Sequence, residues 1–173
     1  MCCYSRPKST QAVQRQLQRG KNRFFKVWMV CAGADELKSP CMWHPVHITK
    51  TGIVASNRRK SGLLKGEEKS LTVDRGIHVF RKRKGADDIC HHSGHIVVPV
   101  YGELENLVAA GGDTAVFTKI KVKREDLEEA LTNVFFKLFD WFDGPEGRKA
   151  AKAWVEKVLK RSHEKRQREA VAA

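Results

Sequence analysis

The stretch Leu71–Lys84, LTVDRGIHVFRKRK, decides how the chain is organised, because it joins an alternating strand to a glycine and a basic run. Its middle residues alternate with the period of two that indicates a half-buried strand. Gly76 stands where the backbone enters this strand and can adopt the positive φ of a tight turn. The two faces of the expected strand carry Ile77 and Val79 on one side and His78 and Phe80 on the other.

Outward from this strand, four more segments show strand patterns, which predicts a sheet of about five strands. The segment 23–32, RFFKVWMVCA, carries apolar residues on both faces, as is typical of a central strand. Pro99 places the segment 95–101 at a sheet edge or a bulge. The other two segments are 46–49 and 114–123. In the second, apolar residues that would face the core alternate with residues that would face solvent.

The C-terminal third predicts two helices. Apolar residues recur at helical spacing through 124–142, and Asp143-Gly144-Pro145 then breaks the pattern. A second helix follows, and its apolar face ends at Leu159. A shorter helix is expected at Glu103–Ala110. Strands followed by helices indicate the α+β class, here a mostly antiparallel sheet packed by a C-terminal helical hairpin.

These patterns divide the chain into three parts. Residues 1–22 are expected to form a basic, flexible arm, whose short helix has little to bury beyond Val13 and Leu17. Residues 23–123 form the β-rich core, and residues 124–173 form the helical hairpin with a basic tail.

The net charge of +13 is unevenly distributed along the chain. Residues 1–100 carry 19 Lys or Arg against 7 Asp or Glu, residues 101–144 carry 5 against 9, and residues 145–173 carry 9 against 4. A basic body with a basic tail favours an anionic partner. Charge alone does not separate nucleic acid, a nucleotide, a membrane surface and an acidic protein.

Membrane insertion and secretion are disfavoured by the sequence. No apolar run reaches the roughly 18 to 20 residues of a membrane span, and the first residues lack the apolar core of a secretory signal. The five cysteines are an odd number, and Cys2 adjoins Cys3, so a disulfide framework is not expected and a reducing compartment is favoured. We therefore expect a cytoplasmic protein that engages no membrane.

Two groups of Cys and His raise the question of zinc, which needs four nitrogen or sulfur ligands. Neither group has the paired CxxC spacing of a zinc ribbon or finger. The alternative interpretation is two histidines flanking a strand and an exposed polar loop, and we predict neither a metal nor a cofactor. Whether the two groups meet in space stays open; they are Cys41/His44/His47 and Cys90/His92/His95.

The sequence contains no nucleophile elbow, no P-loop and no dinucleotide-binding glycine fingerprint. His78 follows Asp74 and Arg75 closely, and histidine titrates near neutrality, so general-base or phosphate-binding chemistry is available there. A single histidine on a strand is more often packed than catalytic, and no second catalytic group can be placed beside it.

Basic clusters are the strongest functional signal, because guanidinium forks match phosphate geometry. If the strand ends and loops converge, these clusters form one phosphate-contacting surface. The predicted ligand-binding residues are Arg58, Arg59, Arg75, His78, Arg81 and Arg83.

Four blocks together resemble small proteins of phages and other viruses: 56–58 (SNR), 75–80 (RGIHVF), 105–109 (ENLVA) and 115–122 (AVFTKIKV). Those proteins share a Gly-x-His-x-Phe strand, an LVA segment and a closing AVFTK strand. The resemblance covers residues 52–123 and implies no established activity. It implies a virus-encoded accessory protein acting in the host cytoplasm.

Three hypotheses follow. The first is a non-enzymatic binding protein for a phosphate-bearing ligand, either a nucleic acid or a nucleotide. The second is an inhibitor or assembly component that engages an acidic protein partner through the helical hairpin and its basic tail. The third is an enzyme acting on a nucleotide or nucleic acid through His78, and it ranks last.

Overall fold

A computed structural model describes residues 3–31, 33, 35–40, 46–55, 71–73, 76–90 and 92–171. Its strands are β1 (Cys3–Ser5), β2 (Arg23–Cys31), β3 (Glu36–Lys38), β4 (Ile53–Ala55), β5 (Leu71–Val73), β6 (Ile77–Phe80), β7 (His95–Gly102), β8 (Leu107–Gly111), β9 (Thr114–Phe117) and β10 (Lys119–Val122). Its helices are α1 (Pro7–Gln18), α2 (Arg83–Asp87), α3 (Arg124–Leu138) and α4 (Gly144–Val171), with a 3-10 turn at Leu104–Asn106.

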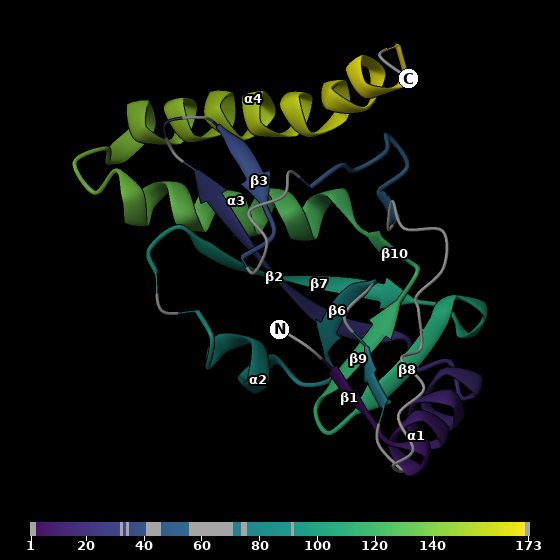
Figure 1. The fold of residues 1–173 in the computed structure, drawn as a ribbon. Coiled ribbons are helices and arrows are strands. Elements are labelled where there is room, and N and C mark those ends of the chain that lie inside the picture. Colours follow the sequence, from purple (N-terminus) through teal and green to yellow (C-terminus); the bar gives the residue numbers. More distant parts are fainter. Residues whose placement is uncertain are drawn as a thin grey trace.

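Eight of these strands form one open antiparallel sheet (Figure 1). Along the sheet the order is β4-β10-β7-β2-β6-β9-β8, and β3 pairs with β2 beside β6. The strands β1 and β5 pair separately. The α+β class and the antiparallel sheet are confirmed, but the expected number of about five strands is too low.

The long pairing of β2 with β7 forms the centre of the sheet, in register from Arg23 opposite Tyr101 to Met29 opposite His95. The side chains on the two faces of β2 belong to different apolar clusters. Trp28 joins the main core, whereas Val27 packs with Phe80 and α2 on the opposite face. The predicted central strand is therefore confirmed over Arg23–Cys31, because both of its faces are covered.

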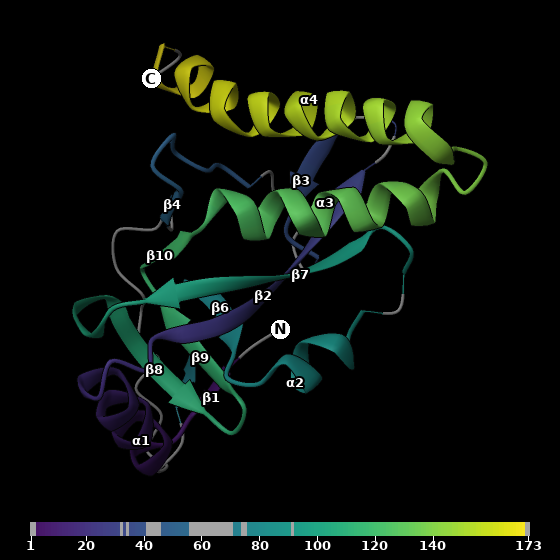
Figure 2. The same cartoon turned by 180° about the vertical axis from the view of Figure 1, so that it is seen from behind.

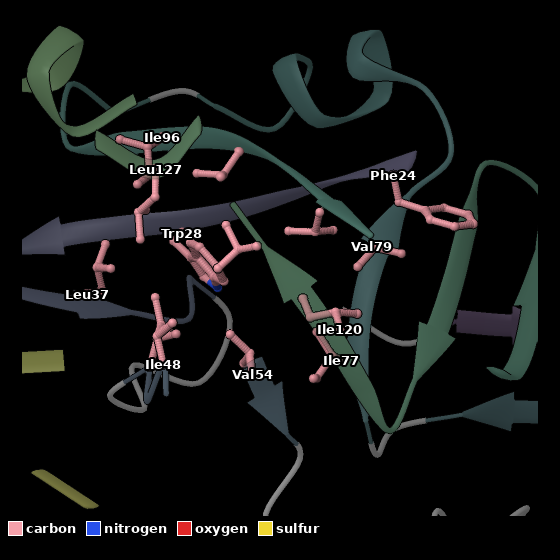
Figure 3. Packing of buried hydrophobic residues seen from close by; sticks show 14 of the residues in the cluster. Phe24, Trp28, Leu37, Ile48, Val54, Ile77, Val79, Ile96, Ile120 and Leu127 are labelled. Atoms are coloured by element: carbon pink, nitrogen blue, oxygen red, sulfur yellow. The ribbon is translucent and has the colours of Figure 1, made fainter. Parts of the chain in front are cut away.

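The helices α3 and α4 lie side by side over one face of the sheet (Figures 1 and 2). Leu131 of α3 and Val158 of α4 are fully buried in the main core. Figure 3 shows how Leu127 approaches Ile96 and Trp28 in this core. The predicted helical hairpin is confirmed, although the first helix ends at Leu138 rather than near residue 142.

Within the stretch 71–84, Leu71–Val73 forms β5 in the separate pair with β1, and Ile77–Phe80 forms β6 with the expected alternation. Ile77 and Val79 face the main core, whereas Phe80 packs with α2. Gly76 has φ +119°, and a Cβ there would stand 2.6 Å from Cγ1 of Val116. Glycine is required at this position because both the backbone angle and the neighbour exclude a side chain.

The predicted helix at 103–110 is wrong. Its first part is the 3-10 turn, and Leu107–Gly111 forms the edge strand β8 paired with β9. Over eight residues, apolar spacing cannot separate a helix from a strand, so long-range pairing decides. The single strand expected at 114–123 is instead two strands, because the chain turns at Thr118, whose backbone N–H donates to the Asn106 carbonyl oxygen.

The strand expected at 46–49 is also wrong. Val46 and Ile48 are buried, but their N–H groups donate to the carbonyl oxygens of Leu37 and Ser162 rather than along one ladder. The paired strand of this region is β4, a few residues later.

The helix α1 has more to bury than the sequence indicated. Val13 is fully buried and Leu17 nearly so, and both belong to the main core. Thr10 fixes the helix to the sheet edge, since its hydroxyl donates to the Ala110 carbonyl and accepts from the Ala110 N–H. The sequence pattern missed this because α1 packs against β8 and the 3-10 turn before it, about 100 residues away.

Candidate anion-binding site

Three of the six predicted ligand-binding residues, Arg58, Arg59 and Arg75, lie outside the described part of the chain. The other three lie on β6 or just after it. His78 is half-buried, and its backbone carbonyl accepts a hydrogen bond of 2.8 Å from Nζ of Lys26.

Both described arginines of the predicted set already make contacts within the protein. Nη1 of Arg81 donates to the Gly112 carbonyl oxygen at 3.3 Å, which holds β6 against the turn between β8 and β9. Nε of Arg83 lies 3.6 Å from Oδ2 of Asp87 in an exposed pair one helical turn apart. Such a pair is weak, so the Arg83 guanidinium stays accessible to a phosphate.

Of the two Cys/His groups, Cys41 and His44 lie outside the described residues. In the other group, the rings of His92 and His95 stack edge to face at 5.1 Å. Burial, with the nearby carboxylate of Asp87, raises the pKa of the Cys90 thiol. Within the described ranges, no three His, Cys, Asp or Glu residues are placed to hold a metal ion.

A basic cavity of about 420 Å³ lies where the segment 48–52, the junction of β10 with α3, and α4 meet. Figure 1 places these three segments together at the end of the helical layer nearer the C-terminus. The predicted residues His78, Arg81 and Arg83 do not line this cavity. We define the basic cavity by its charged lining residues: Lys50, Lys121, Lys123, Arg124, Glu125 and His163.

The turn Thr49–Gly52 forms one rim of the basic cavity and is fixed by its own hydrogen bonds. Oγ1 of Thr49 accepts from the Ile53 N–H at 2.9 Å, and the Gly52 N–H donates to the Thr49 carbonyl oxygen at 2.8 Å. Gly52 has φ +76°, and a Cβ there would stand 2.1 Å from the Val122 carbonyl oxygen. Glycine thus lets the turn approach β10, and Lys50 of the turn lines the same cavity as Lys121 of β10.

The helix α3 begins at the wall of the basic cavity. Its N-cap residue Lys123 makes no capping hydrogen bond through its side chain, whose ammonium lies 5.1 Å from the centre of the Tyr101 ring. The first N–H groups of a helix lack intrahelical acceptors and carry a partial positive charge. This charge adds to that of the surrounding lysines.

Arg124 connects α3 to α4 across the rim. Its guanidinium pairs with Glu128, one turn along α3, and with Glu156 of α4 at 2.9 Å. The hydrogen bond and charge of Glu128, with the charge of Glu156, raise the pKa of Arg124. Lys50 and Lys121, in contrast, form no ion pair with any described carboxylate, so their charges are available to a ligand.

His163 of α4 closes the cavity from the other side. Its Nδ1 lies 2.6 Å from the Ile48 carbonyl oxygen, and a carbonyl only accepts, so Nδ1 carries the proton. Nε2 is then an acceptor in the neutral ring and a donor in the imidazolium. A neighbouring cavity of about 600 Å³ shares His163 and Arg124 and adds Lys157 and Lys160.

Sequence reasoning missed the basic cavity because its basic residues come from three segments that are far apart in the sequence. Lys121 was recognised only as part of the solvent-exposed face of a strand, Lys123 only as the end of that strand, and Lys50 was assigned to no element. The period-two spacing of those lysines was a usable signal. Nothing in the sequence pairs His163 with Ile48.

The fold and this site together describe an α+β protein with a basic cavity where the helical layer meets the sheet. Comparisons of the chain with protein-family models, with curated proteins and with solved structures found no match. The resemblance to phage and virus proteins therefore stays a prediction. Among the described helices, none combines the length and the apolar character needed to cross a membrane.

Proposed function

We propose that the protein binds a phosphate-bearing ligand, a nucleic acid or a nucleotide, in the basic cavity without catalysing a reaction on it. The observation that carries this proposal is the convergence of four Lys or Arg side chains, His163 and the start of α3 on one cavity, against the single carboxylate of Glu125. Cations and backbone N–H groups at a helix start both favour phosphate. The volume lies within the range of small-ligand sites.

The same chemistry suits a longer polyanion that extends beyond the cavity. Lys157 and Lys160 continue the basic lining into the neighbouring cavity, and Arg81 and Arg83 offer further cations on another part of the surface. We further propose, from the sequence resemblance, that the protein is a virus-encoded accessory protein of the host cytoplasm.

The double substitution Lys50→Ala/Lys121→Ala tests the cavity. We expect at least an about tenfold loss of affinity for ATP by calorimetry or for a fluorescent single-stranded oligonucleotide by anisotropy, since two unpaired cations are removed. Lys119→Ala is the matched control, because Lys119 lies on the same exposed face of β10, two residues from Lys121, but does not line the cavity.

Equal losses in the double variant and in the control would overturn the cavity as the binding site. Salt separates the two ligand classes. Affinity for a nucleic acid that contacts several phosphates falls steeply with salt concentration, whereas affinity for a nucleotide falls much less.

The second hypothesis, an acidic protein partner held by the helical hairpin, keeps support from α4. Its exposed surface carries Arg148, Lys149, Lys152 and Lys160. Removal of residues 164–173 would reduce the basic charge while keeping the contact of His163 with Ile48. If this shortened chain binds an acidic partner as tightly as the full chain does, residues 164–173 are not the part that binds it.

A further inference from the structure

The turn that joins α3 to α4 presents an exposed aromatic surface. Trp141 is 69% exposed and Phe142 is 39% exposed. Among the described large hydrophobic side chains, Leu104 is the other one with comparable exposure, at 42%. We call the rings of Phe139, Trp141 and Phe142 the aromatic tip.

The aromatic tip is continuous with the core of the helical hairpin. The Trp141 ring lies 5.6 Å from that of Phe139 and 6.1 Å from that of Phe142. Both neighbours contact the buried ring of Phe135, at 4.9 and 5.8 Å between centroids. The exposed rings therefore stand on a packed aromatic base, which limits their freedom before any partner binds.

Backbone contacts also fix the turn. The Phe142 N–H donates to the Phe139 carbonyl oxygen at 3.1 Å, and the Gly147 N–H donates to that of Asp143 at 3.0 Å. A Cβ at Gly147 would stand 2.9 Å from the Phe142 carbonyl carbon, so glycine lets α4 begin directly against the turn. The rings are presented by a defined backbone and not by a loose loop.

The charge around the aromatic tip is opposite to that of the whole chain. Residues 139–147, FDWFDGPEG, contain the exposed acids Asp140, Asp143 and Glu146 and no Lys or Arg, in a chain of net charge +13. The nearest basic residues along the chain, Lys137 and Arg148, lie at the two borders of this segment. An acidic rim repels phosphate backbones and anionic membrane surfaces.

We propose that the aromatic tip is an interaction surface for a lysine- or arginine-bearing segment of a partner protein. Tryptophan faces attract ammonium and guanidinium groups, and the three carboxylates complement the same charges. Exposed Trp at a packed position is also the residue type that most often dominates binding energy at interfaces. This proposal does not rest on the proposed function, because the basic cavity lies at the opposite end of α3, about 22 Å away for a 15-residue helix.

The test uses the full chain labelled with 5-fluorotryptophan, with the Trp141 fluorine resonance assigned from Trp141→Phe. The probe is a short peptide of alternating lysine and leucine, and its glutamate–leucine counterpart is the control. We expect saturable movement of the Trp141 resonance with the lysine peptide. Trp141→Ala should weaken that peptide at least about tenfold by fluorescence anisotropy, whereas Leu104→Ala, which removes another exposed apolar side chain, should not.

Asp140→Lys/Asp143→Lys keeps the rings and removes the acidic rim, so it should also abolish the response. If the Trp141 resonance does not move when the lysine peptide is added, the proposal is wrong. Movement caused instead by the glutamate peptide, by an oligonucleotide or by phosphatidylserine vesicles would overturn it in favour of another partner class. Movement on raising the protein concentration alone would replace it with self-association.

Discussion

Asp35 ties α4 to the turn between β2 and β3 through a single, nearly buried carboxylate. Its Oδ1 accepts from the Trp154 indole at 2.8 Å, and its Oδ2 accepts from Nζ of Lys157 at 2.6 Å. Burial acts to raise the pKa of Asp35, but the hydrogen bonds from Lys157 and Trp154, with the charges of Lys157 and Arg161, outweigh it and lower the pKa.

We expect Asp35→Asn to lower the free energy of unfolding by about 1 to 3 kcal/mol at pH 7, because Lys157 loses its charge partner. Asparagine tolerates the φ of +47° found here, so the backbone is not disturbed. The folded pKa lies below the unfolded value of about 3.9, so the stabilisation is complete above that value and disappears as pH falls through the folded pKa.

Urea unfolding of both proteins at pH 7 and at pH 3 measures this difference, with Asp140→Asn as an exposed control. If the difference in the free energy of unfolding between wild type and Asp35→Asn is as large or larger at pH 3 than at pH 7, the pKa of Asp35 is not lowered in the folded protein.

At the scale of elements, substitutions in α1 test whether the N-terminal segment is an appendage or part of the core. Val13→Ala should lower the free energy of unfolding by about 2 kcal/mol, because it removes methyl groups from a fully buried position. Gln14→Ala, at an exposed position on the same helix, should change it by less than about 0.5 kcal/mol. Denaturant unfolding measures the change in the free energy of unfolding for each variant. Equally small changes for both would mean that α1 does not unfold together with the core.

Elements with sustained patterns were predictable from sequence, and short elements were not. The strand β2, the two C-terminal helices and the glycine at 76 follow from local periodicity and turn chemistry. The strand β8 was mistaken for a helix because five residues of small and apolar side chains carry no period, and their pairing with β9 is decided across a turn. Burial of Val13 similarly depends on partners far along the chain.

At the scale of the whole molecule, the helical layer separates two surfaces of opposite character. The basic cavity lies where α3 begins, and the aromatic tip lies where α3 ends. The position of the basic cavity was not predictable from overall charge, because Lys50, Lys121 and His163 converge only once the sheet and α4 are assembled. The acidic turn belongs to the end of the stretch 101–144, which carries more Asp and Glu than Lys and Arg, and to the start of the basic segment that follows.

The excess of 33 Lys and Arg over 20 Asp and Glu makes the folded chain repel itself, which predicts a stability that rises with salt. Raising sodium chloride from about 0.01 to 0.15 M shortens the screening length from about 30 to 8 Å. Weakening of exposed pairs such as Arg124 with Glu156 opposes this gain only slightly, since such pairs contribute little. We expect the melting temperature in a zwitterionic buffer to rise by a few degrees, as for about 1 kcal/mol in a domain of this size. Choline chloride at the same ionic strength should act equally, because the effect is screening and not sodium binding. A melting temperature that falls with either salt would mean that the attractive pairs outweigh the net repulsion.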